Sequence, residues 1–291
     1  MSLANTLRFL LTHPLARRNR PAAFSRFIKW QINARLNPHP VAYPFVGDTK
    51  LLAWKGLTGV TGNIYAGLHE FEDMAFLLHF LREKDFFADI GANVGSYTVL
   101  AAGVCGSKTL AAEPLPDTFK ILAENVAINY LAEKVILKNI GLGEKNGVLP
   151  FTKSLDTTNH VAMEGETDTL EVPVQTLDET LPEAPQLIKI DVEGFEMSVL
   201  KGTVKTLANP SLKALIIEIN SASNRYGHNS DEVHQLLVEQ NFRPFEYEPF
   251  SRKISPLSGP NDGNTLYLRD LDFVKKRVET AKKIKVLEQE F

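Results

Sequence analysis

Asp89-Ile90-Gly91-Ala92-Asn93-Val94-Gly95 lies between an apolar run, residues 86–88, and residues 96–102, which have the pattern of a helix. An acid at a strand end, then a loop with two glycines, then a helix, is typical of a site for a small charged cofactor. Backbone N–H groups at a helix start attract anionic groups, and glycine lets a ligand approach the backbone closely. A dinucleotide fingerprint needs G-x-G-x-x-G, whereas the positions counted from Gly91 are Gly91, Asn93 and Ser96. The stretch therefore predicts a cofactor site that does not have the dinucleotide pattern.

The composition is that of an ordinary globular protein of 291 residues, with 44% hydrophobic and 23% charged residues. A core of useful size is therefore available. The single cysteine, Cys105, excludes an intramolecular disulfide and a cysteine-rich zinc site. No run approaches the ~18 apolar residues of a membrane-spanning helix, and Arg8 interrupts the apolar patch near the N-terminus that a signal peptide would need. These features predict a cytoplasmic protein.

Basic side chains are concentrated in residues 1–40, and the first acidic residue is Asp48. The basic residues of this segment are Arg8, Arg17, Arg18, Arg20, Arg26, Lys29 and Arg35. Such asymmetry is typical of an arm that binds an anionic surface or partner, but it also fits a solvated leader that crosses its own acidic domain. Peripheral attachment to the inner face of the membrane, or an oligomer contact, through residues 1–40 therefore stays open.

Strand and helix patterns alternate through the middle of the chain. Strands are predicted at residues 86–89, 109–113, 135–139, 187–192 and 215–220. Helices are predicted at residues 96–102, 117–130, 195–206 and 231–240. Continuous apolar strands alternating with helices indicate an α/β fold, with a parallel sheet covered on both faces. Residues 242–247 and 265–269 have no helical pattern between them and predict an antiparallel C-terminal hairpin at the sheet edge.

Patterns on either side of this alternation are weaker. Residues 22–36 have apolar side chains at helical spacing and predict an amphipathic helix. Further predictions are short strands at 51–54 and 63–65, a helix at 72–81, a small β element in the insertion 141–185, and a charged helix at 271–291. The chain is thus divided into a basic, helical N-terminal extension (1–55), a main domain (56–270) and a C-terminal helix (271–291).

Two acids near the glycine loop are candidates for cofactor binding. Glu113 ends the second predicted strand, 24 residues after Asp89, where an acid can accept hydrogen bonds from both hydroxyls of a ribose. Asp89 would orient the loop and, through it or through water, the amino group of a cofactor. Each acid also has a purely structural interpretation, as the cap of the helix near Pro116 or as an acceptor for loop amides.

The segment I-K-I-D-V-E-G-F-E, residues 188–196, is the second dense signal. Lys189, Asp191 and Glu193 share one face if strand geometry persists, because side chains alternate along a strand. A lysine in a buried strand is costly unless it is paired. Ligands in open α/β sheets bind beyond the carboxyl ends of the strands, where Asp191 lies. The segment predicts a structural ion pair or a catalytic group, and both can coexist.

In this order, D-I-G-A-N-V-G-S-Y-T, E-P, T-L-D-E, I-K-I-D-V-E-G-F-E-x-x-V-L-K-G and I-I-E-I, the motifs resemble those of the FkbM family of methyltransferases. Glu70 occupies the place of an acid typical of that family. The resemblance covers roughly residues 63–269. It implies a Rossmann-like class I methyltransferase fold with a mostly parallel seven-stranded sheet, and S-adenosylmethionine as the cofactor. Residues 56–270 would then be the S-adenosylmethionine-dependent methyltransferase domain.

The resemblance also implies O-methylation, with a hydroxyl of a sugar, glycan or other small natural product as the acceptor. Asp191 is the first candidate for the base that removes the hydroxyl proton, with Lys189 or Glu193 orienting it. The candidate cofactor-binding residues are Glu70, Asp89, Gly91, Asn93, Gly95, Tyr97, Thr98, Glu113, Asn139 and Asp191. No metal is assigned, although acids in this segment are compatible with Mg²⁺.

Three alternatives are weighed against this interpretation. A nucleic-acid methyltransferase fits poorly, because the fourth strand ends in D-V-E-G and not in N/D-P-P-Y/F, and because aromatic platforms among basic residues are not evident outside the leader. A dehydrogenase would need the missing glycine pattern. A non-enzymatic adenosylmethionine-binding or scaffold protein at an anionic membrane surface would use the basic residues 1–40.

Overall fold

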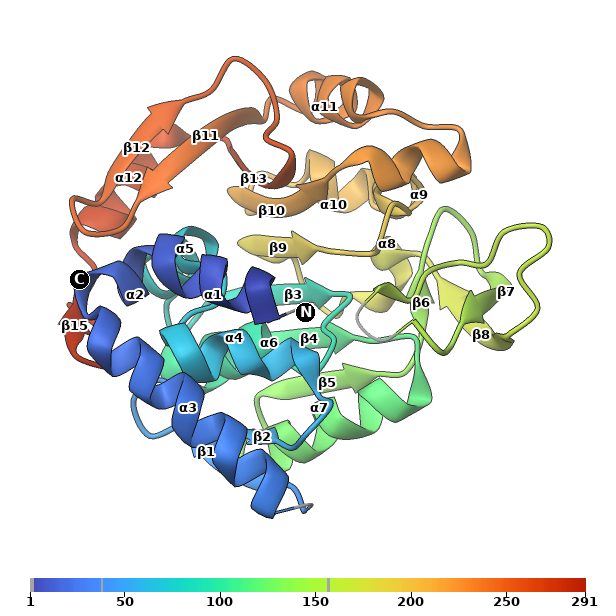
Figure 1. The fold of residues 1–291 in the computed structure, drawn as a ribbon. Helices are drawn as coiled ribbons and strands as arrows, with labels where there is room; N and C mark the ends of the chain where they lie inside the picture. Colours follow the sequence, from blue (N-terminus) through green and yellow to red (C-terminus); the bar gives the residue numbers. More distant parts are fainter. Residues whose placement is uncertain (1–2, 38, 156–157) are drawn as a thin grey trace.

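The computed structural model describes residues 3–37, 39–155 and 158–291, and its centre is one large sheet (Figure 1). Its parallel strands are β3 (Phe86–Ile90), β4 (Lys108–Ala112), β5 (Val135–Lys138), β9 (Leu187–Ile190) and β10 (Ala214–Ile219). Its antiparallel strands are β11 (Arg243–Glu248), β12 (Lys253–Pro256) and β13 (Gly263–Leu268). The strand order is β12-β11-β13-β10-β9-β3-β4-β5, which confirms the mixed α/β fold with a mainly parallel centre.

The sheet has eight strands, so the predicted number of seven is wrong. The predicted antiparallel hairpin is present, with β13 lying between β10 and β11. The additional strand, β12, pairs with β11 at the outer edge. Its four residues are K-I-S-P, half-buried or exposed, and such a short edge strand carries no alternating pattern that a sequence could show.

Each face of the sheet has its own hydrophobic core, because successive side chains of β3 point to opposite faces. Phe87 belongs to one core, and Phe86 and Ala88 belong to the other. The first core includes residues of α5 (Phe71–Phe80), α6 (Ser96–Val99), the π-helical turn η1 (Leu100–Val104), α7 (Pro116–Ile128) and α12 (Leu271–Glu279). The second includes residues of α8 (Leu177–Thr180), α9 (Glu196–Lys201), α10 (Val204–Ala208) and α11 (Ser230–Glu239).

The N-terminal segment joins the first core through several helices. Its elements are α1 (Leu3–Thr12), α2 (Pro14–Arg18), α3 (Arg20–Leu36), the hairpin β1 (Val41–Pro44) and β2 (Lys50–Ala53), and α4 (Thr58–Ala66). Leu10, Leu15 and Trp30 are buried in that core. The short strand predicted at 63–65 is wrong, because these residues lie in α4, where the Asn63 side chain donates to Ser96 Oγ and accepts from the His69 N–H.

Helix α3 confirms the helix predicted at 22–36, but its apolar side chains do not form one buried face. Ala23 and Trp30 are buried, and the Trp30 ring packs edge-on against Tyr43 at 5.1 Å between centroids. Ile28, Ile32 and Leu36 are exposed. None of the helices in the described part of the chain has the length and apolar composition needed to cross a bilayer.

The C-terminal and inserted segments also differ in part from the predictions. The predicted helix 271–291 is α12 followed by a hairpin of β14 (Lys285–Val286) and β15 (Gln289–Glu290). The predicted helix 195–206 is split into α9 and α10, and a 3₁₀-helix, η3 (Ser221–Tyr226), follows β10. The β element predicted in 141–185 is confirmed as a sheet of β6 (Gly141–Leu142), β8 (Thr169–Gln175) and β7 (Gly147–Thr152), at one end of the molecule in Figure 1.

Phe291 explains why the chain does not continue as a solvated helix after α12. Its ring packs edge-on against Phe71 at 5.1 Å and against His79 at 5.4 Å between centroids, and only 4% of the residue is exposed. The β14–β15 hairpin returns this side chain to the first core.

We expect Phe291→Ala to lower the free energy of unfolding by about 3 kcal/mol, since it removes a buried aromatic ring and leaves a cavity. Urea unfolding followed by circular dichroism measures this change. Val204→Ala, at an exposed position, is the matched control and should cost under about 0.5 kcal/mol. Equal stability of the two variants would contradict the packing described for Phe291.

Candidate active site

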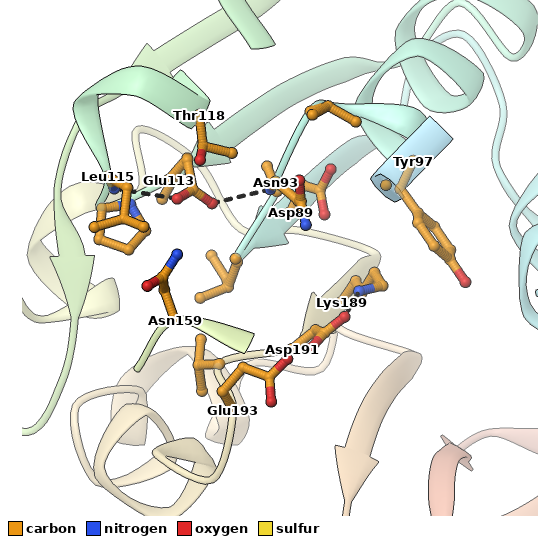
Figure 2. Close-up of a pocket in the computed structure, with 18 of the residues that line it drawn as sticks. Asp89, Asn93, Tyr97, Glu113, Leu115, Thr118, Asn159, Lys189, Asp191 and Glu193 are labelled. Atoms are coloured by element: carbon orange, nitrogen blue, oxygen red, sulfur yellow. Dashed lines mark hydrogen bonds and ion pairs between the residues drawn. The ribbon is translucent and has the colours of Figure 1, made fainter. Parts of the chain in front are cut away.

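A cavity of about 430 Å³ lies at the carboxyl ends of β3, β4, β9 and β10 (Figure 2). This volume is within the usual range for small-molecule sites, and the place is where open α/β sheets bind ligands. One wall consists of residues that follow the strands. The rest of the cavity lining comes from α4 and the loop after it, and from the β6–β8 insertion.

Three residues of the glycine loop after β3 have positive φ angles. Gly91, Asn93 and Gly95 have φ angles of +75°, +50° and +89°. A Cβ atom at residue 91 would collide with the carbonyl oxygen of Asp191. The close approach that requires glycine at this position is therefore between two loops of the protein.

Glu113 connects the loop after β3 with the loop after β4, as Figure 2 shows. Its Oε2 accepts the Asn93 N–H at 3.0 Å, and its Oε1 accepts the Leu115 N–H at 3.1 Å. Burial raises the pKa of this carboxyl from 4.5 to about 7, against the effect of these two hydrogen bonds. A carboxylate has about four acceptor positions, so two remain for hydroxyl groups of a ligand.

Asp89 is 1% exposed and has one satisfied and one unsatisfied oxygen. The Thr98 hydroxyl donates to Oδ2 at 2.6 Å, whereas Oδ1 has no hydrogen-bond partner in the described part of the chain. Burial raises the pKa of Asp89 to about 6, although the Lys189 ammonium opposes that shift. A buried acceptor without a partner is costly, so a ligand that donates to Oδ1 would stabilise this site.

Lys189 forms the charged floor of the cavity. Its Nζ donates to Asp191 Oδ2 at 2.7 Å and lies 4.8 Å from the centroid of the Tyr97 ring. The Tyr97 hydroxyl in turn donates to Glu70 Oε2 at 2.7 Å. Burial by itself lowers the pKa of Lys189, but the carboxylates of Asp191, Glu70 and Asp89 outweigh burial and raise it. The predicted ion pair is thus present, and the lysine is positively charged.

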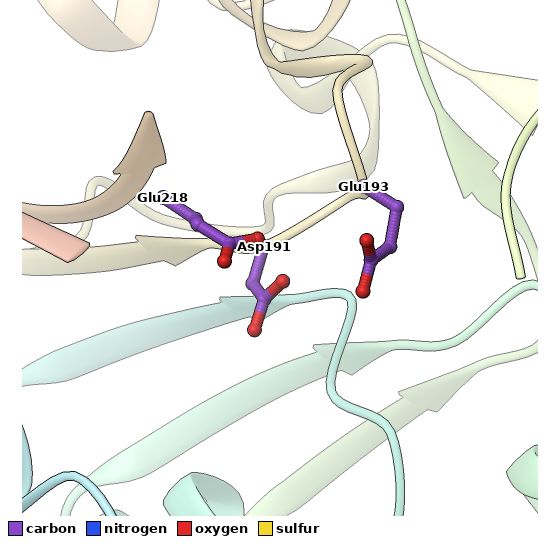
Figure 3. Close-up of side chains that lie close together, drawn as sticks. All are labelled: Asp191, Glu193 and Glu218. Carbon is purple, nitrogen blue, oxygen red and sulfur yellow. The ribbon is translucent and has the colours of Figure 1, made fainter. Parts of the chain in front are cut away.

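Asp191, the partner of Lys189, is also one of three carboxyl groups that lie together (Figure 3). One oxygen from each of Asp191, Glu193 and Glu218 lies within 4.8 Å of the other two. Burial and the nearby Asp191 and Glu193 carboxylates raise the pKa of Glu218 to about 8. Burial and Asp191 raise that of Glu193 to about 7. Groups with such pKa values exchange protons near neutral pH, as general acid–base catalysis requires.

Glu218 is absent from the residues predicted from the sequence. The signal that could have identified it is an acid inside the apolar run I-I-E-I of β10. The spacing of the three carboxyl groups would also suit a hard divalent cation. One of the three carboxylates, Asp191, is already paired with the Lys189 ammonium.

The structure brings most of the predicted site residues together around the cavity. Those that line it are Glu70, Asp89, Gly91, Asn93, Tyr97, Glu113, Lys189, Asp191 and Glu193. Thr98, Gly95 and Asn139 lie behind it. Thr98 is fully buried against Asp89, Gly95 packs on Leu122, and the Asn139 amide donates to the Glu113 and Pro114 carbonyl oxygens at 2.9 Å.

Two other segments line the cavity without having been predicted to do so. The first supplies Thr58, Gly59, Asn63 and His69, and the second, in the insertion, supplies Phe151, Leu155, Asn159 and Val161. Both are far in the sequence from the motif after β3. Their positions result from contacts between segments far apart in the sequence, which no local sequence pattern encodes.

Comparison with known proteins identifies methyltransferases. The family model of the methyltransferase FkbM domain matches residues 89–244, which is more than half of the chain. The hexuronic acid methyltransferase AglP of Haloferax volcanii is 33% identical over 170 residues, covering 56% of this chain and 65% of that protein. Methyltransferase 1 of Beauveria bassiana is 30% identical over 147 residues, covering 41% and 59%. In both, the matched part spans less than two thirds of the relative's own length.

Among solved structures, methyltransferase FkbM from Methylobacillus flagellatus KT is 17% identical to this chain. It aligns with a TM-score of 0.46, over 72% of this chain and 52% of that one.

The raised pKa of Glu113 predicts how stability depends on pH. Because the folded state holds a proton that the unfolded chain releases between pH 4.5 and about 7, stability should fall as pH rises through this window. In Glu113→Gln this fall should be smaller, by up to about 3 kcal/mol. Urea unfolding at pH 4.5, 5.5 and 7.5 measures the difference. Glu83→Gln, at an exposed carboxylate, is the control, and an equal pH dependence in the two variants would refute the assignment.

Proposed function

Because the chain belongs to the FkbM methyltransferase family, we propose that it transfers a methyl group from S-adenosylmethionine to a hydroxyl of a sugar, glycan or other small natural product. One observation carries the proposal. The cavity is lined by Asp89, whose buried Oδ1 has no hydrogen-bond partner among the described residues, and by Glu113, whose carboxylate can still accept hydroxyl groups. The name of one relative, a hexuronic acid methyltransferase, supports a sugar acceptor.

The described residues fit this cofactor. Asp89 Oδ1 would accept a hydrogen bond from its amino group, and Glu113 would accept the two ribose hydroxyls. Glu70 and Tyr97 close the wall next to Asp89. When bound, S-adenosylmethionine supplies a methyl group on a positively charged sulfur. An acceptor oxygen can attack the methyl carbon, with the sulfur as the leaving group. The protein then contributes mainly by holding that oxygen in line and by removing its proton.

Asp191 is the group that we propose takes the proton of the acceptor hydroxyl. Lys189 fixes one carboxylate oxygen of Asp191, Oδ2, and Asp191 lines the cavity. Glu218 lies beside Asp191, with one oxygen of each carboxyl group within 4.8 Å of the other, and burial together with the negative charge of Asp191 raises the pKa of Glu218 to about 8. Glu193, held at a φ of +55°, adds a third carboxyl at the acceptor side.

A protein that only binds the cofactor or only serves as a scaffold is not favoured. The family is one of methyltransferases, and both relatives described above are named as such. Pure binding would also gain nothing from a cluster of carboxyl groups with pKa values near 7 and 8 beside the cofactor position.

Calorimetry with adenosylhomocysteine tests the cofactor site. Asp89→Ala and Glu113→Ala should each weaken binding about 10- to 100-fold, since each removes a charged hydrogen-bond acceptor. Glu83→Ala should bind like the wild type, and thermal unfolding should verify that all variants are folded. Undiminished binding in both site variants would contradict the proposed site.

The catalytic assignment needs the acceptor, which mass spectrometry of glycans and metabolites from cells with and without the protein can identify by the mass of one added methylene unit. With that acceptor, Asp191→Asn should lower kcat by about 10²–10⁴-fold. The affinity of this variant for adenosylhomocysteine, measured in parallel, separates the role of Asp191 as a base from the role in cofactor binding that is also predicted for it. An unchanged kcat would remove Asp191 from the role of base.

The pH profile tests the role of Glu218. Because the pKa of Glu218 is raised to about 8, the wild-type kcat/KM should rise between pH 7 and 9 as Glu218 loses its proton and its negative charge favours proton transfer to Asp191. Glu218→Gln removes the group that titrates in this range, so this rise should be absent. A purely structural role for Glu218 would leave the midpoint of the profile in place.

A further inference from the structure

The outward side of α3 is apolar although no part of the described chain covers it. Ile28, Ile32 and Leu36 are 53%, 55% and 79% exposed. They recur every four residues, so they lie one above the other on the same side of the helix over about 12 Å. We call these three residues, with the exposed Lys29 and Arg35 beside them, the outer face of α3.

This stripe differs from ordinary exposed apolar residues, which are scattered singly over a protein surface and need no explanation. Figure 1 shows α3 at the periphery of the molecule, with α4 beside it. The core side of α3 is already satisfied by Ala23 and Trp30, with Phe24 and Phe27 packed partly against the same core. The exposed aliphatic side chains therefore do not take part in packing α3 against the core.

The charge around this face has one sign. No acidic residue precedes Asp48, so the helix cannot neutralise its own basic side chains. Two arginines of the segment contact charged or aromatic side chains near the C-terminus of the chain. Arg26 pairs with Glu288 at 2.9 Å, and the guanidinium of Arg18 lies 3.5 Å from the centroid of the Phe250 ring. Arg17, Arg20, Lys29 and Arg35 are exposed and make no ion pair with the described residues.

We propose that the outer face of α3 docks on the surface of an anionic phospholipid bilayer. Aliphatic side chains can enter the boundary between headgroups and acyl chains, while neighbouring Lys and Arg side chains bind the phosphates. The single sign of charge disfavours a second copy of this chain as the occupant. A two-fold contact would place the basic side chains of this face against their own equivalents, with no acid of the same face between them.

The docked face is one helix away from the cavity. Helix α3 packs on α4, and α4 contributes Thr58, Gly59 and Asn63 to the cavity wall. Docking through α3 would therefore hold the candidate active site at a fixed distance from the lipid surface, without covering the strand ends that carry Asp191 and Glu218.

Co-sedimentation of the full chain with vesicles tests this inference. Vesicles of phosphatidylcholine alone should bind weakly. Vesicles containing about one third phosphatidylglycerol should bind the protein, and binding should weaken as the salt concentration rises. The triple variant Ile28→Ser/Ile32→Ser/Leu36→Ser should bind at least about tenfold more weakly. Lys29→Glu/Arg35→Glu should lose at least as much on anionic vesicles and nothing on neutral ones.

Matched controls separate this face from exposed residues in general. Val148→Ser/Val204→Ser removes apolar side chains that are 57% and 60% exposed elsewhere, and Lys145→Glu reverses an exposed charge in the insertion. Both should bind anionic vesicles like the wild type. Adenosylhomocysteine affinity, measured on every variant, should stay constant, so that a failure of docking is distinct from a failure of the proposed function.

Three results would overturn the proposal. The first is absence of binding to anionic vesicles, and the second is full binding by the triple variant. The third is a dimer, seen by light scattering without lipid, that the triple variant loses while vesicle binding is absent. That last result would assign the face to a second copy of the chain.

Discussion

The candidate site depends on one buried positive charge. Lys189 extends from a central strand, with only 4% of its surface exposed, into a region where Asp89, Glu70 and Asp191 carry negative charge. Desolvation of an unpaired ammonium would be prohibitive, and so would that of several unpaired carboxylates in the same place. The opposite charges of the ammonium and the carboxylates reduce the cost of burying each of them. The pair between Lys189 and Asp191 orients the carboxylate toward the cavity and keeps Glu218 and Glu193 close to it.

Local patterns were sufficient for the centre of the fold. Continuous apolar runs gave the five parallel strands, each within one or two residues of its observed bounds, because strands buried on both faces leave a clear signal. The two charged motifs also lie where strand ends meet. Asp89 and Lys189 are partners in neighbouring strands, so residues a hundred positions apart in the chain share one cavity.

Prediction failed where packing over long sequence distances decides the structure. Asn63 reads as part of a strand, yet its side chain bonds Ser96 and His69 from within a helix. Phe291 follows a charged stretch and still returns to the core beside Phe71. Glu218 becomes part of the site only because β10 lies next to β9, which brings it beside Asp191. For α3 the spacing of apolar residues was correct, but spacing alone does not say which of them the core can accept.

The crowding at Gly91 ties the two motifs into one mechanical unit. The Asp191 carbonyl occupies the space where a side chain at residue 91 would begin, so the loop of the proposed nucleoside site packs directly against the backbone that carries the proposed base. Substitutions at either loop are therefore felt at the other, and their energetic effects should not add. The α4 region and the β6–β8 insertion line the same cavity but stand outside this junction, so under the proposed function we expect substitutions there to alter acceptor preference with less effect on the two motifs.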